Sequence, residues 1–317
     1  MSIFPTRILL ATDGSKGADL AGRVAAVLAA GTGSELHVVH VYGIAPWYPV
    51  FPEGEGFEQA EAEEPPAEED HGWVSERRTR ELLDEEVQKI VSGGGTVARA
   101  HLREGAPAQE IVGLAEELGA GLIVVGSRGL GGIRRALMGS VSDSVVRHAH
   151  CPVLVVRGEA RGQAGGQAEA FPTKILMATD ASEEARLAAT TAADMAKRTG
   201  SELEVVHVGE VRPVSHPEWR GYHARYEDLR EKSQRLLEGR VEEIESTGGT
   251  VARAHLRMGH PDEEIVGLAE ETGADLIVVG SRGLGGIRRA LMGSVSDSVV
   301  RHAHCAVLVV RNTEGRA

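Results

Sequence analysis

Glycines and a serine recur twice in the sequence at a spacing that suits the binding of phosphate groups. Two glycines three positions apart are followed, after nine residues, by Gly-Ser; the members are Gly126, Gly129, Gly139 and Ser140, then Gly280, Gly283, Gly293 and Ser294. Glycine lets a backbone approach a ligand closely. The N–H groups of such a loop, and those that open the next helix, bind phosphate oxygens. The spacing predicts a phosphate cradle in each copy.

The sequence excludes two commoner nucleotide-binding motifs, while one structural alternative to the phosphate cradle stays open. The sequence lacks G-x-x-x-x-G-K-[ST], and Arg134 stands where the dinucleotide fingerprint needs a glycine. Arg128, Arg134 and Arg135 supply positive charge beside the loop. The alternative is that Ser140 and Asp143 form a capping box, in which case the glycines are only a helix-entry turn.

The two loops belong to an internal duplication of the chain. Residues 7–13 return in similar form as 174–180, residues 95–103 return unchanged as 249–257, and residues 122–151 return unchanged as 276–305. The offset falls from 167 to 154, so the first copy carries 13 extra residues between about 43 and 75. A stretch rich in Gly, Ala and Gln separates the copies and is typical of a flexible linker. We predict domains over 1–157 and 173–312, joined by a linker over 158–172.

The elements that must position the loops alternate between strand and helix. In the first copy, short apolar runs predict strands at 8–12, 36–41, 96–102, 122–125 and 153–156, and helical periodicity predicts helices at 16–30, 74–91, 107–118 and 141–148. The second copy repeats the pattern between 174 and 310. This alternation predicts a doubly wound α/β fold with five parallel strands per copy. Ligands of such sheets bind at the carboxyl ends of the strands.

Composition narrows the classes of partner and the location. The net charge of −13 disfavours general binding to nucleic acid or to anionic membranes. The sequence has no apolar run long enough to cross a bilayer and no signal-peptide pattern at its start, so we expect a cytoplasmic protein. The only two cysteines, Cys151 and Cys305, occupy equivalent positions, which favours buried thiols over a disulfide.

The chain resembles the universal stress protein family, once in each half. The resemblance rests on residues 8–15 (ILLATDGS), on His40-Val41, on the glycine loop and on residues 151–156 (CPVLVV). It implies two tandem flavodoxin-like or Rossmann-like domains, each with a five-stranded parallel sheet in the order 3-2-1-4-5. The family also associates through its fifth strand, which implies an internal pseudo-dimer here and leaves a homodimer of tandems open.

The resemblance further implies an ATP site, with Mg²⁺, in each half. The aspartate after the first strand contacts the ribose or adenine end, the end of the second strand contacts adenine through its backbone, and the loop holds the phosphates. The matching positions are Ala11, Thr12, Asp13, Val41, Gly126, Ser127, Arg128, Gly129, Gly139, Ser140 and Val141 in the first half, and Ala178, Thr179, Asp180, Val208, Gly280, Ser281, Arg282, Gly283, Gly293, Ser294 and Val295 in the second. In the second half, Ala181 stands at the position that Gly14 has in the first. A left-handed turn would be strained at Ala181, so the two sites would differ in their affinity for ATP.

Three functions remain after this comparison. The leading one is a regulatory, ATP-binding protein of the stress response, acting on protein partners that the sequence does not identify. The second is a slow ATPase or phosphoryl-transfer enzyme, for which Asp13 and His101 are the only candidate bases. The third is an interaction module that binds no nucleotide.

Three further features of the sequence have structural explanations. The acidic stretch 53–70 is typical of a solvated loop, with a docking site for a basic partner as the alternative. Aromatic residues cluster at 42–73 and 219–226 and either cover the nucleotide as a lid or pack locally. His148 and His150 lie at a helix end, which explains them better than a metal site does.

Overall fold

The structure is a computed structural model that describes residues 3–43, 76–127, 138–157, 170–211, 221–283 and 292–311. Several features predicted above therefore lie outside the described residues: the acidic stretch 53–70, the aromatic residues between 47 and 73, Arg128, Gly129 and most of the linker.

The first half contains the predicted alternation of strands and helices. Its elements are β1 (Arg7–Thr12), α1 (Lys16–Thr32), β2 (Glu35–Tyr42), α2 (Glu76–Ser92), β3 (Arg99–Glu104), α3 (Pro107–Leu118), β4 (Leu122–Gly126), α4 (Ser140–His148) and β5 (Val153–Val156). One boundary was wrong: the third strand starts at Arg99, where pairing with His37 begins, and not at 96. Val97 is apolar because it packs against the core from the turn before the strand.

The second half repeats this order. Its elements are β6 (Lys174–Thr179), α5 (Glu183–Thr199), β7 (Glu202–Glu210), α6 (Gly221–Ser246), β8 (Arg253–Gly259), α7 (Pro261–Thr272), β9 (Leu276–Gly280), α8 (Ser294–His302) and β10 (Ala306–Val310). Capping residues determine where the helix that follows the first strand begins and ends in each half. Ser15 and Ser182 accept hydrogen bonds as N-caps, and Gly33 and Gly200 end the helices in the left-handed conformation.

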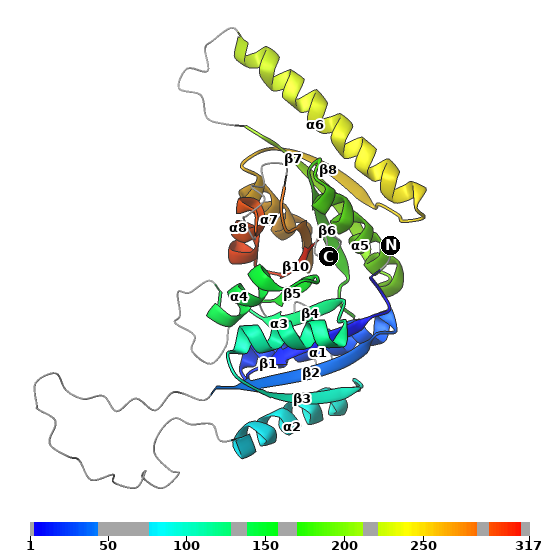
Figure 1. Ribbon diagram of the computed structural model, residues 1–317. Helices are drawn as coiled ribbons and strands as arrows, with labels where there is room; N and C mark the ends of the chain where they lie inside the picture. Colours follow the sequence, from blue (N-terminus) through cyan, green and yellow to red (C-terminus); the bar gives the residue numbers. More distant parts are fainter. Residues whose placement is uncertain are drawn as a thin grey trace, which may run out of the picture.

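All ten described strands form one sheet in the order β3-β2-β1-β4-β5-β10-β9-β6-β7-β8 (Figure 1). Each half therefore has the order 3-2-1-4-5 that the resemblance implied. Neighbours are parallel within each half, whereas β5 and β10 are antiparallel at the junction, where Leu154 lies opposite Leu308. The carboxyl ends of the strands consequently point in opposite directions in the two halves, and the two predicted sites lie at opposite edges of the sheet.

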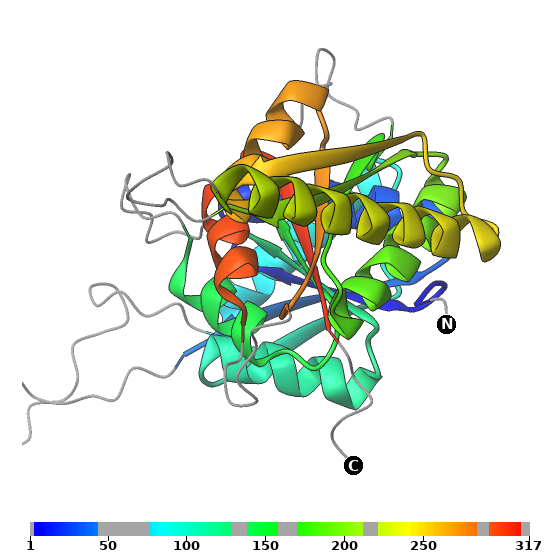
Figure 2. The same ribbon diagram turned by 90° about the horizontal axis from the view of Figure 1, so that it is seen from above.

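Helices cover both faces of the sheet, and alternate strand residues point to opposite faces. Leu10 packs with α1, α2, α5 and α6 in one hydrophobic cluster, whereas Leu9 packs with α3, α4, α7 and α8 in the other. Both clusters run through both halves. The helix α6 runs beside the edge strand β8, as both ribbon views show (Figure 1 and Figure 2).

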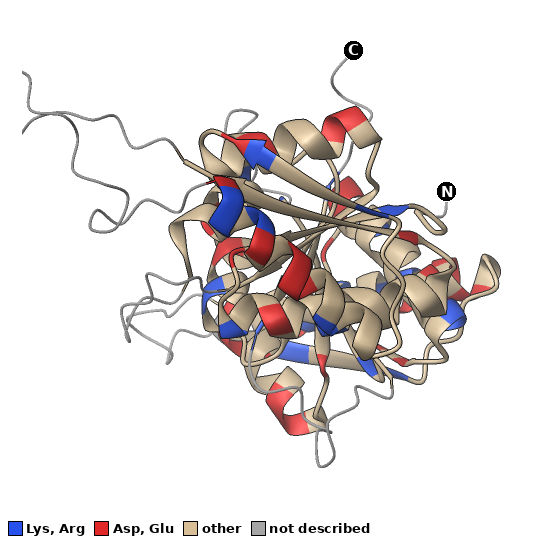
Figure 3. Cartoon of the chain, turned by 90° about the horizontal axis from the view of Figure 1, so that it is seen from below, with Lys and Arg blue, Asp and Glu red and all other residues tan. Residues whose placement is uncertain are grey.

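Charged residues are mixed over the helices. In the view of Figure 3, positions of Lys and Arg and positions of Asp and Glu are scattered over the elements. Among the described residues, no helix combines the length and apolar character needed to span a membrane.

Candidate functional site

The chain leaves β1 through a tight turn that holds Asp13 at the edge of the sheet. Gly14 has a left-handed φ of +73°, and its N–H donates to the Thr12 hydroxyl at 3.2 Å. The N–H of Ser15 donates to the Asp13 carboxylate at 3.0 Å. Ser15 then accepts from Ala18 N–H at 3.2 Å as the N-cap of α1. Asp13 is thus fixed, half-buried, where a strand gives way to a helix.

The glycine loop of the first half is closed by hydrogen bonds between its two ends. The N–H of Gly139 donates to the carbonyl of Ser127 at 2.8 Å, and the Ser142 hydroxyl donates to the carbonyl of Gly126 at 2.7 Å. The second half repeats both bonds: Gly293 N–H donates to the Ser281 carbonyl at 2.8 Å and the Ser296 hydroxyl to the Gly280 carbonyl at 2.6 Å. These bonds bring the start of α4 and α8 back to the end of the preceding strand.

The helices after the loops begin at a glycine. Gly139 and Gly293 are the N-cap residues, and among the described residues no side-chain cap is found at the start of α4 or α8. The capping box of Ser140 and Asp143 is not formed, because Gly139 and not Ser140 is the N-cap. Asp143 pairs with Arg147, at 2.8 Å. Uncapped N–H groups and the positive end of the helix dipole favour an anion at this position.

The first glycine of each loop packs tightly against the helix that follows the first strand of its half. A Cβ on Gly126 would lie 2.8 Å from the carbonyl carbon of Gly17, and one on Gly280 would lie 2.8 Å from that of Glu184. The first glycine of each loop is thus required by the close packing of strand against helix, which is a structural reason independent of any ligand.

The second half brings the loop and the aspartate together. A Cβ on Gly283 would lie 2.5 Å from Oδ2 of Asp180, so the loop backbone runs directly against this carboxylate. A Cβ on Gly293 would lie 3.4 Å from Cα of Arg282 and 3.7 Å from the Gly283 nitrogen. The aspartate, the loop glycine and the start of α8 therefore meet at one place. Arg282 is held there by Glu184, with Nε 3.3 Å from Oε1.

The remaining predicted residues occupy the same edges. Ala11 and Ala178 near the ends of β1 and β6, and Val41 and Val208 near the ends of β2 and β7, pack against one hydrophobic cluster, while Thr12 and Thr179 are buried. Ser140, Val141 and Ser294 are exposed in the first turn of their helices, where Val295 is half-buried. Arg128 and Gly129 lie outside the described residues, so only the second loop is seen to reach its aspartate.

Two histidines and one arginine at the strand ends were not predicted as site residues. Burial lowers the pKa of His40, opposed by the nearby Asp13 carboxylate. Its counterpart His207 contacts the Thr179 carbonyl through Nδ1 at 2.7 Å. Arg240 of α6 donates to the Thr179 hydroxyl at 3.1 Å. His40 was visible as part of the family pattern, whereas Arg240 has no signal in the sequence, because Glu86 stands at its place in the first copy.

His101, His37 and the two cysteines are not among the residues that meet at these strand ends. His101 contacts His37, with Nε2 3.0 Å from Nδ1, and burial lowers its pKa to about 4. Cys151 and Cys305 are free thiols whose pKa is raised to about 12 by burial. Within the described residues, no three His, Cys, Asp or Glu side chains are grouped as metal ligands.

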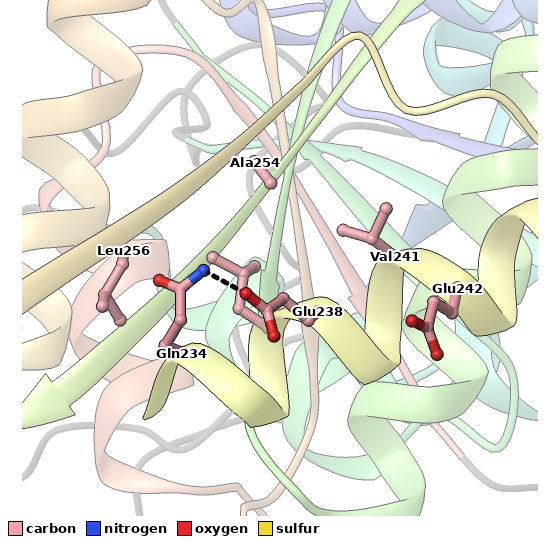
Figure 4. A pocket seen from close by; sticks show the side chains of 7 residues that line it. Gln234, Glu238, Val241, Glu242, Ala254 and Leu256 are labelled. Atoms are coloured by element: carbon pink, nitrogen blue, oxygen red, sulfur yellow. Dashed lines mark hydrogen bonds between the residues drawn. The ribbon is translucent and has the colours of Figure 1, made fainter. Parts of the chain in front are cut away.

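A cavity of about 320 Å³ lies between α6 and β8 and shares no residue with the predicted site (Figure 4). Its lining comprises Gln234, Leu237, Glu238, Val241, Glu242, Ala254 and Leu256. Gln234 donates to Glu238, one turn further along α6, at 2.7 Å. The strand ends, and not this cavity, are therefore the candidate site.

Comparison with known proteins agrees with this geometry. The model of the universal stress protein family matches residues 5–157 and 172–311. A universal stress protein of Mycolicibacterium smegmatis is 31% identical over 236 residues, which are 72% of this chain and 75% of that protein. A putative universal stress protein of Staphylococcus haemolyticus is 41% identical over 142 residues, which are 44% of this chain and 85% of that one.

A solved structure extends the agreement to the whole chain. The crystal structure of a universal stress protein from Archaeoglobus fulgidus has a TM-score of 0.67 at 24% identity and covers 99% of both chains, which shows a common fold. The resemblance predicted from the motifs is confirmed, because the family match spans both halves and each half carries the strand order expected of it. The chain belongs to the universal stress protein family and contains two of its domains in tandem.

Proposed function

We propose that each half binds one ATP, with Mg²⁺, and that the nucleotide regulates a stress-response protein acting in the cytoplasm. The observation that carries this proposal is the meeting of Asp180, Gly283 and the start of α8 at the carboxyl ends of the strands. A carboxylate suits ribose hydroxyls, and an uncapped helix start suits phosphates. The two kinds of group lie side by side, as a nucleotide would need.

The residues fit the parts of ATP as follows. The Asp180 carboxylate would accept from the ribose or adenine end, and the backbone near Val208 would meet the base. The N–H groups of Gly283, Gly293 and Ser294 would donate to the phosphates. A side chain on Gly283 would fill the space beside Asp180, since its Cβ would stand 2.5 Å from the carboxylate. The first half would use Asp13, Val41, Gly139 and Ser140 in the same way. Mg²⁺ would neutralise phosphate charge in this acidic protein.

Binding is favoured over hydrolysis as the main activity. Hydrolysis needs a base or a group that orients water. His101, one of the two candidates, contacts His37, and burial lowers its pKa to about 4, which makes it a weak base. Asp13 is engaged by the Ser15 N–H. A bound nucleotide at one hundred times its Kd stabilises a fold by about 2.7 kcal/mol. That stabilisation is enough to shift a conformational equilibrium to which a partner protein responds.

Calorimetric titration with MgATP, joined to mass spectrometry of small molecules released from the purified protein, tests the proposal. We expect two ATP per chain in the wild type. Gly283→Val should reduce this to one, because its side chain would clash with Asp180. The matched control is Gly267→Ala on α7, whose Cβ would meet nothing within 4 Å, and which should keep both sites. Neither heat nor released nucleotide from the wild type would contradict the proposal and favour an interaction module.

A further inference from the structure

The turn that carries the aspartate is built differently in the two halves. In the first half, Gly14 is left-handed and its N–H donates to the Thr12 hydroxyl. Ala181, at the equivalent position, has no positive φ, in keeping with the steric penalty that a Cβ meets there. The predicted strain is therefore absent. The hydroxyl of Thr179 donates instead to the carbonyl of Asp180, at 3.1 Å.

A buried arginine holds this rearranged turn. The side chain of Arg240 on α6 is 10% exposed. Its Nε donates to the Thr179 hydroxyl at 3.1 Å, and its Nη2 lies 3.5 Å from the Asp180 carbonyl oxygen. Glu243, three residues further along α6, pairs with Nη1 and balances the charge. His207 of β7 contacts the carbonyl of Thr179 from the neighbouring strand. Side chains from two elements, α6 and β7, thus converge on Thr179 and Asp180.

Among the described residues of the first half, no arginine takes the place of Arg240 beside the equivalent turn. Glu86 stands at the position of Arg240. Its buried carboxylate lies 3.6 Å from Nζ of Lys89 and interacts with Asp19. Nδ1 of His40, the counterpart of His207, has no hydrogen-bond partner among the described residues. There, the turn after Asp13 contains the left-handed Gly14, whose N–H donates to the Thr12 hydroxyl, and the Ser15 N–H donates to the Asp13 carboxylate.

We propose that Arg240 is a positioning residue of the second nucleotide site. It fixes the turn of Thr179 and Asp180 so that the Asp180 carboxylate stays beside Gly283, a task that the left-handed Gly14 performs in the first half. This inference rests on the proposed function, because it concerns the same site. A site whose ligand-binding group is already held in place loses less conformational freedom on binding. Removal of Arg240 therefore weakens binding at the second site only.

The test uses two backgrounds that each keep one site in the full chain. Asp13→Ala leaves the second site, and Asp180→Ala leaves the first. In the Asp13→Ala background, Arg240→Gln is expected to raise the Kd for MgATP about tenfold, the factor that corresponds to about 1.4 kcal/mol. In the Asp180→Ala background, the matched change Glu86→Gln is expected to leave the Kd within twofold, because Glu86 interacts with Lys89 and Asp19.

Two further variants distinguish a positioning role of Arg240 from a general loss of packing of α6. Adding Ala181→Gly to Arg240→Gln lets residue 181 adopt the left-handed turn of Gly14, and the Kd should return to within threefold of that of the Asp13→Ala parent. Leu237→Ala, which removes a buried side chain of the same helix, should lower the melting temperature and leave the Kd within threefold.

The failures of the inference and of the proposed function are distinguishable. An unchanged Kd in Arg240→Gln, or the same loss in Leu237→Ala, would overturn the positioning role while leaving ATP binding intact. So would a tenfold loss that Ala181→Gly does not reverse. Absence of MgATP binding by the wild type and by both one-site backgrounds would overturn the proposed function, and the positioning role with it.

Discussion

Arg147 of α4 and Asp297 of α8 form an ion pair across the junction of the two halves, with Nη2 2.8 Å from Oδ1. The contact is reciprocal, since Arg301 reaches Asp143 at 3.0 Å. Each arginine also pairs with the aspartate one turn earlier on its own helix, at 2.8 Å. The four side chains form a closed network beside the antiparallel pair β5 and β10, on the helices that begin at the two predicted phosphate sites.

This network should contribute measurably to stability. Arg147→Ala is expected to lower the free energy of unfolding by about 1 kcal/mol, because the pair is two-thirds buried and part of a network. Urea denaturation provides the measurement, and a cycle with Asp297→Ala gives the coupling. The control is Arg77→Ala. The Arg77 side chain is 92% exposed, and its Nε lies 3.6 Å from Oε1 of Glu81. A loss there as large as at Arg147 would contradict the prediction.

A buried carboxyl group should make the first half less stable as the pH rises. Burial, with the neighbouring Asp19, raises the pKa of Glu86 to about 7, above the ordinary value of 4.5. The folded state favours the protonated form of Glu86. The resulting contribution to the free energy of unfolding is complete below pH 4.5 and is lost as the pH rises through 7. Glu86→Gln should raise the free energy of unfolding by about 1–2 kcal/mol at pH 8.

The same variant should differ little from the wild type near pH 4.5, where Glu86 is protonated in the folded chain. Urea denaturation at both pH values gives the comparison. A gain of equal size at the two pH values would point to packing and would contradict the titration.

The paired histidines of the first half should make it sensitive to acid. Burial lowers the pKa of His37 and of His101, the latter to about 4, below the ordinary 6.5. The contribution of these two neutral histidines to the free energy of unfolding is present above pH 6.5 and is lost as the pH falls toward 4. The second half has Glu204 opposite His255 at 2.8 Å instead. His37→Glu should therefore reduce the loss of melting temperature between pH 7.5 and 5.0 by a few degrees.

Differential scanning calorimetry would check this prediction. Thr190→Ser, a conservative change on the exposed side of α5, serves as the control because Thr190 only bonds to its own helix, at Arg186. Equal acid sensitivity in the wild type and in His37→Glu would assign the effect to other groups.

The two thiols should react slowly in the native protein. Burial raises the pKa of Cys151 and Cys305 to about 12, so hardly any thiolate forms at pH 8. We expect alkylation by iodoacetamide to be at least tenfold slower than in 6 M guanidinium, as measured by mass spectrometry. Rapid native labelling of Cys151, which is 7% exposed, would show that β5 opens at the junction.

Much of the fold and part of the site follow from the sequence alone. The repeat and the short apolar runs predicted every strand of the first half, since buried parallel strands are continuous apolar runs. The family resemblance placed Asp180 and Gly283 in one predicted ATP site, and the structure brings them side by side. The third strand was placed too early, because Val97 is apolar for packing outside the sheet.

Only the tertiary structure decided how the halves join and how the sites differ. Residues 122–151 and 276–305 are identical, and nothing in an identical pair of segments reveals that Arg147 meets Asp297. That contact depends on the antiparallel pairing of β5 with β10. The reach of Arg240 to Thr179 likewise joins residues 61 positions apart, and it depends on where α6 packs. Periodicity reports which face of an element is buried, whereas the partner of a single polar side chain is set by the packing of distant elements.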